Sequence, residues 1–170
     1  GSNAKLNVGF TRRIWGEYGS EGSSYSDLPN HQSTWEPNPT NATAGNAVLL
    51  DYSGGQRGLR LDPTRVQAEA QAWLTNLDTV WPGAAAAAKR TQGNRLVAHL
   101  QHWPSDPFSL GSYTSNPPGY FTLWEGRVGA PLGNLFFGGE HTDSFYEWQG
   151  FMEGACNSGI RAAGALLDSL

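Results

Sequence analysis

The stretch Asn134–Leu170, NLFFGGEHTDSFYEWQGFMEGACNSGIRAAGALLDSL, joins a short apolar run to a Gly-Gly-Glu turn and then to a segment with helical patterning. The apolar run at 135–137 predicts a buried strand. Gly138 and Gly139 would let the backbone come close to a ligand. Glu140 places a carboxylate at the carboxyl end of the predicted strand, where open α/β sheets bind ligands. This order of elements is typical of a segment that holds a cofactor.

A helix is predicted from about Trp148 onward. Apolar or small residues recur at 148, 151, 152, 155, 156, 159, 160, 163, 166 and 167, the spacing of a helix buried along one stripe. Glycines at 150, 154, 159 and 164 would let this helix pack closely on a sheet and bring the amides of its first turn up to a ligand. Cys156 lies on the stripe, so we expect a core thiol rather than a reactive or metal-binding one.

Two blocks of sequence point to one family. The run FFGGEHT, followed by WQGFMEGACNSGIRAA at 148–163, closely resembles the C-terminal flavin-binding segment of the flavin-dependent amine oxidases, which include monoamine, polyamine, putrescine and L-amino-acid oxidases. The second block is His102-Trp103, DPFSLGSY at 106–113 and PPG at 117–119, and it resembles the substrate-site strand and loop that precede that segment. The run KLNVGFTRRIW at 5–15 is similar to the strand that opens the later half of the family's substrate domain.

The expected fold class is α+β. Residues 5–133 should form a mixed or antiparallel substrate-domain sheet with packed helices, and residues 134–170 the C-terminal strand and helix of an FAD-binding domain. Strand-like segments lie at 5–10, 33–36, 47–52 and 95–103. Asp62-Pro63 predicts a helix start, and a second short helix is expected over 84–90.

No GxGxxG turn occurs in the sequence, although the family uses one to hold the ADP half of FAD. The resemblance therefore predicts that the N-terminal dinucleotide-binding half is missing and that this chain is the C-terminal portion of a larger enzyme. The family's lysine near the flavin N5 should lie outside the chain as well. Residues 1–4, Gly-Ser-Asn-Ala, fit a remnant of tag cleavage, although family members can also carry Asn-Ala-Lys at this place.

The resemblance places Tyr113 and Phe151 where two aromatic side chains stand up from the flavin face and form a cage for the amine. Many members have tyrosine at both positions, so Phe151 departs from that version. An aromatic slot holds an amine through the ring quadrupole, and its low polarity favours the uncharged form that can donate a hydride. Trp103 is expected to form a wall of the substrate or flavin pocket. The alternative for all three is ordinary core packing.

The resemblance also assigns the flavin-binding residues. Glu140 would accept hydrogen bonds from hydroxyls of the flavin ribityl chain or near the phosphates, with the amides near His141 and Thr142 facing the diphosphate. The alternative for Glu140 is a helix cap or a surface acid. The amide of Met152 would lie near the flavin pyrimidine carbonyl. Ser112 stands where covalently flavinylated members carry cysteine, so the FAD should be noncovalent. The remaining predicted cofactor-binding residues are Gly138, Gly139 and Trp148.

The predicted function is oxidative deamination of an amine by hydride transfer to FAD, with O2 reoxidising the flavin and yielding H2O2. The isolated chain should be inactive and should not retain FAD. Expected partners are the amine, O2, the missing N-terminal FAD-binding portion and, through the exposed apolar stripe at 148–167, a second copy of the chain. The alternative is a noncatalytic aromatic-rich module, for example for carbohydrate, since the chain has seven Trp, six Tyr and seven Phe.

Composition excludes other classes. The 11 basic and 15 acidic residues leave a net charge of −4 without a basic cluster, which argues against nucleic acid as a partner. No apolar run approaches the roughly 20 residues of a membrane span, and no signal-like segment opens the chain, so a cytoplasmic location is expected with export left open.

No metal site is expected, because His99 and His102 should face opposite sides of a strand. Asn41-Ala42-Thr43 matches a glycosylation acceptor but has little weight without a secretory signal.

Overall fold

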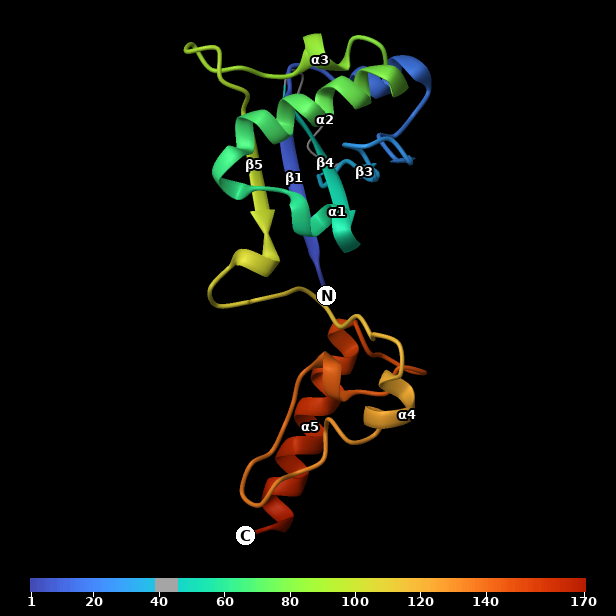
Figure 1. Ribbon diagram of the computed structural model, residues 1–170, viewed down its shortest axis with the longest axis vertical. Helices are drawn as coiled ribbons and strands as arrows, with labels where there is room; N and C mark the ends of the chain where they lie inside the picture. Colours follow the sequence, from blue (N-terminus) through green and yellow to red (C-terminus); the bar gives the residue numbers. More distant parts are fainter. Residues whose placement is uncertain (39–45) are drawn as a thin grey trace. The chain divides into compact units, whose positions relative to one another are not determined.

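The computed structural model describes residues 1–38 and 46–170 and contains two compact units. One unit spans Ser2–Gly111, and the other spans Ser112–Leu170 together with Gly1 (Figure 1). The acceptor triplet Asn41-Ala42-Thr43 lies outside the described residues. The boundary at 133/134 between substrate-domain and flavin-binding segments stays a prediction, since compactness of the backbone does not test what each segment binds.

An antiparallel sheet of five strands forms the centre of the Ser2–Gly111 unit, with the strand order β2-β3-β4-β1-β5 (Figure 1). The strands are β1 (Asn3–Phe10), β2 (Ser24–Tyr25), β3 (Ser33–Trp35), β4 (Ala47–Gly54) and β5 (Ala98–His102). The register of β1 and β4 runs from Asn3 opposite Gly54 to Phe10 opposite Ala47. The expected α+β class and the antiparallel sheet are confirmed. Strand β1 includes Asn3 and Ala4, and the origin of residues 1–4 stays a prediction.

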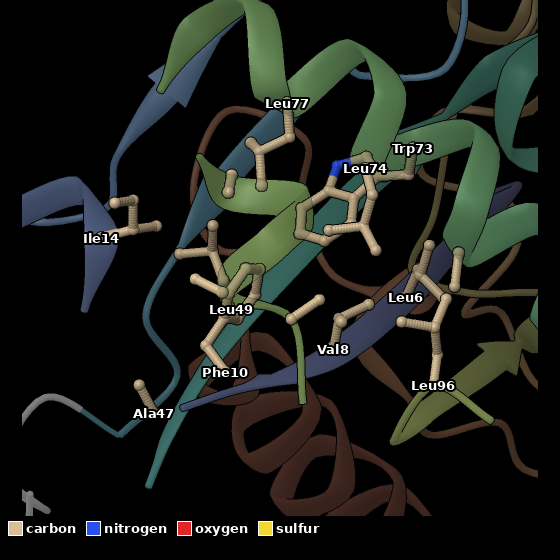
Figure 2. Packing of buried hydrophobic residues seen from close by; sticks show 14 of the residues in the cluster. Leu6, Val8, Phe10, Ile14, Ala47, Leu49, Trp73, Leu74, Leu77 and Leu96 are labelled. Carbon is tan, nitrogen blue, oxygen red and sulfur yellow. The ribbon is translucent and has the colours of Figure 1, made fainter. Parts of the chain in front are cut away.

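The core of this unit lies between the sheet and helix α2 (Val66–Val80), which crosses the strands in Figure 1. Strand β1 buries Leu6, Val8 and Phe10 on one face, as the period of two requires. Helix α2 buries Trp73, Leu74 and Leu77, and these side chains point toward the strands in Figure 2. The Phe10 ring meets the Trp73 ring edge to face at 6.3 Å, a favourable aromatic geometry. Two different periodicities therefore meet in one apolar layer.

Helix α1 (Gly55–Arg60) follows β4, and a 3₁₀ turn at Pro63–Arg65 leads into α2. The Asp62 side chain accepts a hydrogen bond from the Thr64 amide at 2.8 Å, which confirms the predicted helix start. Helix α3 (Ala84–Ala87) is shorter than the expected helix over 84–90. It ends early because Ala88 bridges Phe10 and the Lys89 amide donates to the Gly9 carbonyl at 2.7 Å, so the chain there extends the edge of the sheet.

The Ser112–Leu170 unit contains helices α4 (Tyr120–Trp124) and α5 (Met152–Asp168), and a 3₁₀ turn, η4, at Glu140–Thr142. Helix α5 begins four residues later than expected, because the chain at 148–151 makes a turn in which the Phe151 amide donates to the Trp148 carbonyl at 3.0 Å. The strand predicted at 135–137 is wrong: this segment has only an isolated bridge between Leu132 and Leu135. A strand needs a hydrogen-bonded neighbour along its length, and the described part of this unit contains no strand to supply one.

The apolar stripe of α5 is exposed within this chain rather than buried. Only Gly154 and Ser158 of the helix are buried, while the Met152 side chain is 86% exposed and that of Ile160 is 73% exposed. The expectation that Cys156 is a core thiol is therefore wrong, because its side chain is exposed. Helix α5 contacts η4, where Arg161 Nη2 donates to the Thr142 hydroxyl at 2.9 Å, and its small residues Ser158 and Gly159 meet the two glycines that precede η4. No helix among the described residues is long and apolar enough to cross a membrane.

Candidate functional site

The Gly-Gly-Glu turn is packed against the middle of α5. Gly139 has a φ of +144°, a conformation that favours glycine, and its amide donates to the Ser158 hydroxyl at 2.9 Å. A Cβ added at Gly138 would lie 3.5 Å from the Cα of Gly159, so the two backbones approach closely here. The Thr142 hydroxyl donates to the Gly139 carbonyl at 2.8 Å. These glycines therefore position the turn on the helix, which is a role additional to the ligand approach expected from the sequence.

Glu140 connects three separate segments of this unit. Its Oε1 accepts from the amide of Thr114 at 2.7 Å and from the Thr114 hydroxyl at 3.0 Å, and its Oε2 accepts from the amide of Gly150 at 2.7 Å. Glu140 is therefore neither a free surface acid nor a simple helix cap. A carboxylate has about four acceptor sites, so three donors leave room for one more, such as a ligand hydroxyl.

A second polar contact joins the same segments. The Asn116 Nδ2 donates to Gln149 Oε1 at 2.7 Å, and Gln149 Nε2 reaches the carbonyls of His141 at 3.3 Å and Asp143 at 3.4 Å. Sequence reasoning missed Thr114, Asn116 and Gln149, because uncharged side chains in loops carry no periodic signal. Their position beside Tyr113 and Phe151 in the two family-like blocks was the only indication available.

The predicted cage residues Tyr113 and Phe151 both lie in the Ser112–Leu170 unit, and both are exposed in this chain, at 49% and 61%. Trp148 meets the Phe151 ring edge to face at 6.1 Å. Core packing, the alternative interpretation of these rings, is not what this chain shows. Their role as a cage stays a prediction. Trp103 opens a 3₁₀ turn (Trp103–Ser105) in the Ser2–Gly111 unit, half-buried, so its role as a pocket wall also stays a prediction.

The first turn of α5 has the donor character that an anionic or hydroxyl-rich group requires. No side chain caps this end of the helix, and Phe151 holds the N-cap position in an extended conformation after Gly150, whose φ is +86°. The first amides of a helix have no intrahelical acceptors and favour negative charge nearby. Three buried oxygens of the same unit have no hydrogen-bond partner among the described residues: Ser112 Oγ, Asn116 Oδ1 and Asp143 Oδ2. This donor and acceptor set fits a polar cofactor such as a flavin.

Metal ligation is not supported by the described residues, which contain no group of three or more His, Cys, Asp or Glu that could hold an ion. His99 is exposed and His102 is buried, so they face opposite sides of β5 as expected. Both ring nitrogens of His102 have partners, the Ser105 hydroxyl at 2.8 Å and the Gly58 carbonyl at 3.0 Å. His102 is therefore a structural residue of the Ser2–Gly111 unit.

A buried polar network in the Ser2–Gly111 unit was not predicted from the sequence. Asp51 is 1% exposed and accepts from the Ser53 hydroxyl at 2.6 Å and from Arg57 Nη2 at 3.4 Å. His31 is fully buried and contacts the Ser24 hydroxyl at 2.8 Å through Nε2. Burial lowers the pKa of His31, Asp51 acts in the opposite direction, and Arg57 lowers it further. The Ser24 hydroxyl also pairs with the Thr34 hydroxyl at 2.6 Å, and the Gln32 amide donates to Asp51 at 3.1 Å, so these contacts join β2, β3 and β4 within the Ser2–Gly111 unit.

Comparison with known proteins decides the family. The family model described as flavin containing amine oxidoreductase matches residues 1–167. The chain belongs to this family. An L-amino-acid oxidase of Daboia siamensis is 26% identical to this amine oxidoreductase chain over 163 residues, covering 95% of the chain and 38% of the relative. The flavin-containing amine oxidase A of Sus scrofa is 38% identical over 84 residues, covering 46% of the chain and 16% of the relative.

Solved amine oxidases share the fold. Cyclohexylamine oxidase from Brevibacterium oxydans superposes with a TM-score of 0.78 at 22% identity, covering 99% of this chain and 35% of that protein. Wild-type putrescine oxidase bound to putrescine superposes with a TM-score of 0.74 at 18% identity. The chain thus spans little more than a third of the length of these relatives. Family membership implies a flavin cofactor and favours the oxidase prediction over the carbohydrate-binding module.

Proposed function

We propose that the full-length enzyme containing this amine oxidoreductase chain converts an amine into an imine, which then hydrolyses. When bound, FAD would supply the redox chemistry by accepting a hydride from the carbon beside the nitrogen and passing two electrons to O2, which yields H2O2. One observation carries the proposal. The predicted cage residues Tyr113 and Phe151, the Glu140 turn and the uncapped start of α5 all belong to one unit, and the contacts of Glu140 link them.

The side chains of Tyr113 and Phe151 would hold the amine between their rings. Their low polarity would exclude water and favour the neutral amine, since burial disfavours a charged group. Trp148, edge to face with Phe151 at 6.1 Å, would support one wall of this slot. The slot therefore orients the substrate rather than exchanging protons with it.

The cofactor would be held by the remaining predicted residues. The amides of Gly138 and His141 and the remaining acceptor site of Glu140 would bind the ribityl and phosphate groups. The amides of Gly139 and Thr142 already donate to the Ser158 hydroxyl and the Gly139 carbonyl, so these two residues would shape the turn instead. The Met152 amide, at the uncapped start of α5, would stabilise negative charge on the flavin ring. The proposed location is the cytoplasm, with export as the alternative.

Substrate oxidation by the full-length enzyme tests the proposal. A panel of primary amines, polyamines and amino acids should include at least one compound that bleaches the flavin anaerobically and produces peroxide in air. Tyr113→Ala and Phe151→Ala should each lower kcat/KM about ten- to a thousandfold while FAD stays bound, because positioning is lost. Tyr146→Ala is a matched control, since Tyr146 is 81% exposed in the same unit. A panel without bleaching or peroxide would reject the function, and unchanged turnover in both cage variants would reject the cage.

The 170-residue chain should bind FAD weakly, because the resemblance assigns the adenine, ribose and most diphosphate contacts to a dinucleotide-binding half. A submicromolar affinity corresponds to a binding free energy of about 8 kcal/mol or more. Losing half of that free energy would leave a dissociation constant in the millimolar range. Isothermal titration with FAD measures this directly, and a micromolar Kd would show that the chain holds a complete flavin site. Sedimentation of the same sample tests the expected self-association through the exposed stripe of α5.

A further inference from the structure

Glu140 lies between the two residues proposed to form the amine cage. We propose that Glu140 is a positioning residue whose carboxylate sets the spacing of Tyr113 and Phe151, a role that rests on the proposed function and goes beyond contact with the cofactor. Its Oε1 accepts from the amide of Thr114, which follows Tyr113, at 2.7 Å. Its Oε2 accepts from the amide of Gly150, which precedes Phe151, at 2.7 Å. One carboxylate therefore fixes the backbone beside both rings.

The geometry requires a carboxylate rather than any polar side chain. Both oxygens accept from backbone N–H groups, and hydrogen bonds to an ionised acceptor are about twice as strong as neutral ones. In Glu140→Gln the carbonyl oxygen could accept from Thr114 or from Gly150, but not from both, because the other side would present an NH2 group to an N–H donor. This isosteric substitution should release one of the two backbone segments.

A neighbouring contact repeats the connection without a charge. Asn116 Nδ2 donates to Gln149 Oε1 at 2.7 Å, so the segment after Tyr113 and the segment before Phe151 are joined a second time. Gln149 Nε2 in turn reaches the His141 carbonyl in η4 at 3.3 Å. Both ends of the proposed cage are therefore tied to the turn that carries Glu140.

Hydrogen exchange tests the connection independently of catalysis. In the full-length enzyme, Glu140→Gln should raise exchange about tenfold or more in at least one of the two peptides that contain Thr114 and Gly150. Glu147→Gln is the matched control, since Glu147 is exposed and nearby, and it should leave both peptides unchanged. Asn116→Ala should raise exchange in the same two peptides by a smaller factor. Unchanged exchange at both peptides in Glu140→Gln would overturn the proposal.

A double-mutant cycle tests whether the connection acts through the cage. At saturating FAD, Glu140→Gln should lower kcat/KM about ten- to a hundredfold when Tyr113 is present, the scale of a misplacement near 1 Å. The same substitution should cost less than about threefold in a Tyr113→Ala background, because the ring that it would displace is already absent there. A loss of flavin contact would instead persist equally in both backgrounds. Equal losses in both backgrounds would overturn the proposal. An enzyme inactive toward every amine would reject the proposed function instead, and the exchange result would still decide the connection.

Discussion

Alanine substitution at Gly154 and at Gly164 isolates the close approach at the start of α5. A Cβ added at Gly154 would collide with the Trp148 carbonyl oxygen and lie 3.0 Å from Asp143 Oδ2, whereas a Cβ at Gly164 meets nothing within 4 Å. The Trp148 carbonyl cannot yield easily, because it also accepts from the Phe151 amide at 3.0 Å. Both substitutions gain about 0.8–1 kcal/mol of helix propensity, so the difference between them reports the collision alone.

Overpacking costs about 1–3 kcal/mol. We therefore expect Gly164→Ala to stabilise α5 by about 1 kcal/mol, and Gly154→Ala to lie between neutral and about 2 kcal/mol destabilising. Native-state hydrogen exchange of the α5 amides in the 170-residue chain measures both, with about tenfold in protection for each 1.4 kcal/mol. Equal changes in protection for the two variants would refute the close approach of Gly154 to the Trp148 carbonyl and, with it, the described packing of the 148–151 turn on the start of α5.

Three further predictions follow from the structure. Leu74→Ala should cost about 2–5 kcal/mol in urea unfolding, because Leu74 is fully buried in the core, and a loss below about 1 kcal/mol would contradict that packing. Burial lowers the pKa of His31, so as the pH falls below about 6.5 the unfolded chain takes up a proton at His31 before the folded chain does, and stability should fall on acidification. His31→Gln should flatten this dependence of stability on pH, whereas identical pH profiles for the two proteins would contradict the lowered pKa of His31. Acid precipitation of the full-length holoenzyme should release all its flavin, because Ser112 offers no thiol, and flavin on the precipitate would show a covalent link.

Local patterns in the sequence were sufficient for much of the Ser2–Gly111 unit. The alternation that buries Leu6, Val8 and Phe10 is visible in the sequence of β1, and the Asp62 cap needs only the next two residues. The family could also be predicted from the sequence, since the Gly-Gly-Glu turn and the segment that follows it form one continuous motif. Such features depend on neighbours within a few positions, so the sequence states them directly.

Contacts between distant segments were decided only by the tertiary structure. Glu140 is 26 residues from Thr114 and 10 from Gly150, so nothing in its local sequence indicates that it connects them. The exposure of Cys156 and the absent strand at 135–137 have the same cause. Periodicity shows which side of an element is apolar, and a strand-like composition shows that a segment prefers an extended backbone. Whether an apolar side is covered, or an extended segment finds a hydrogen-bonded neighbour, depends on which other segments fold against it.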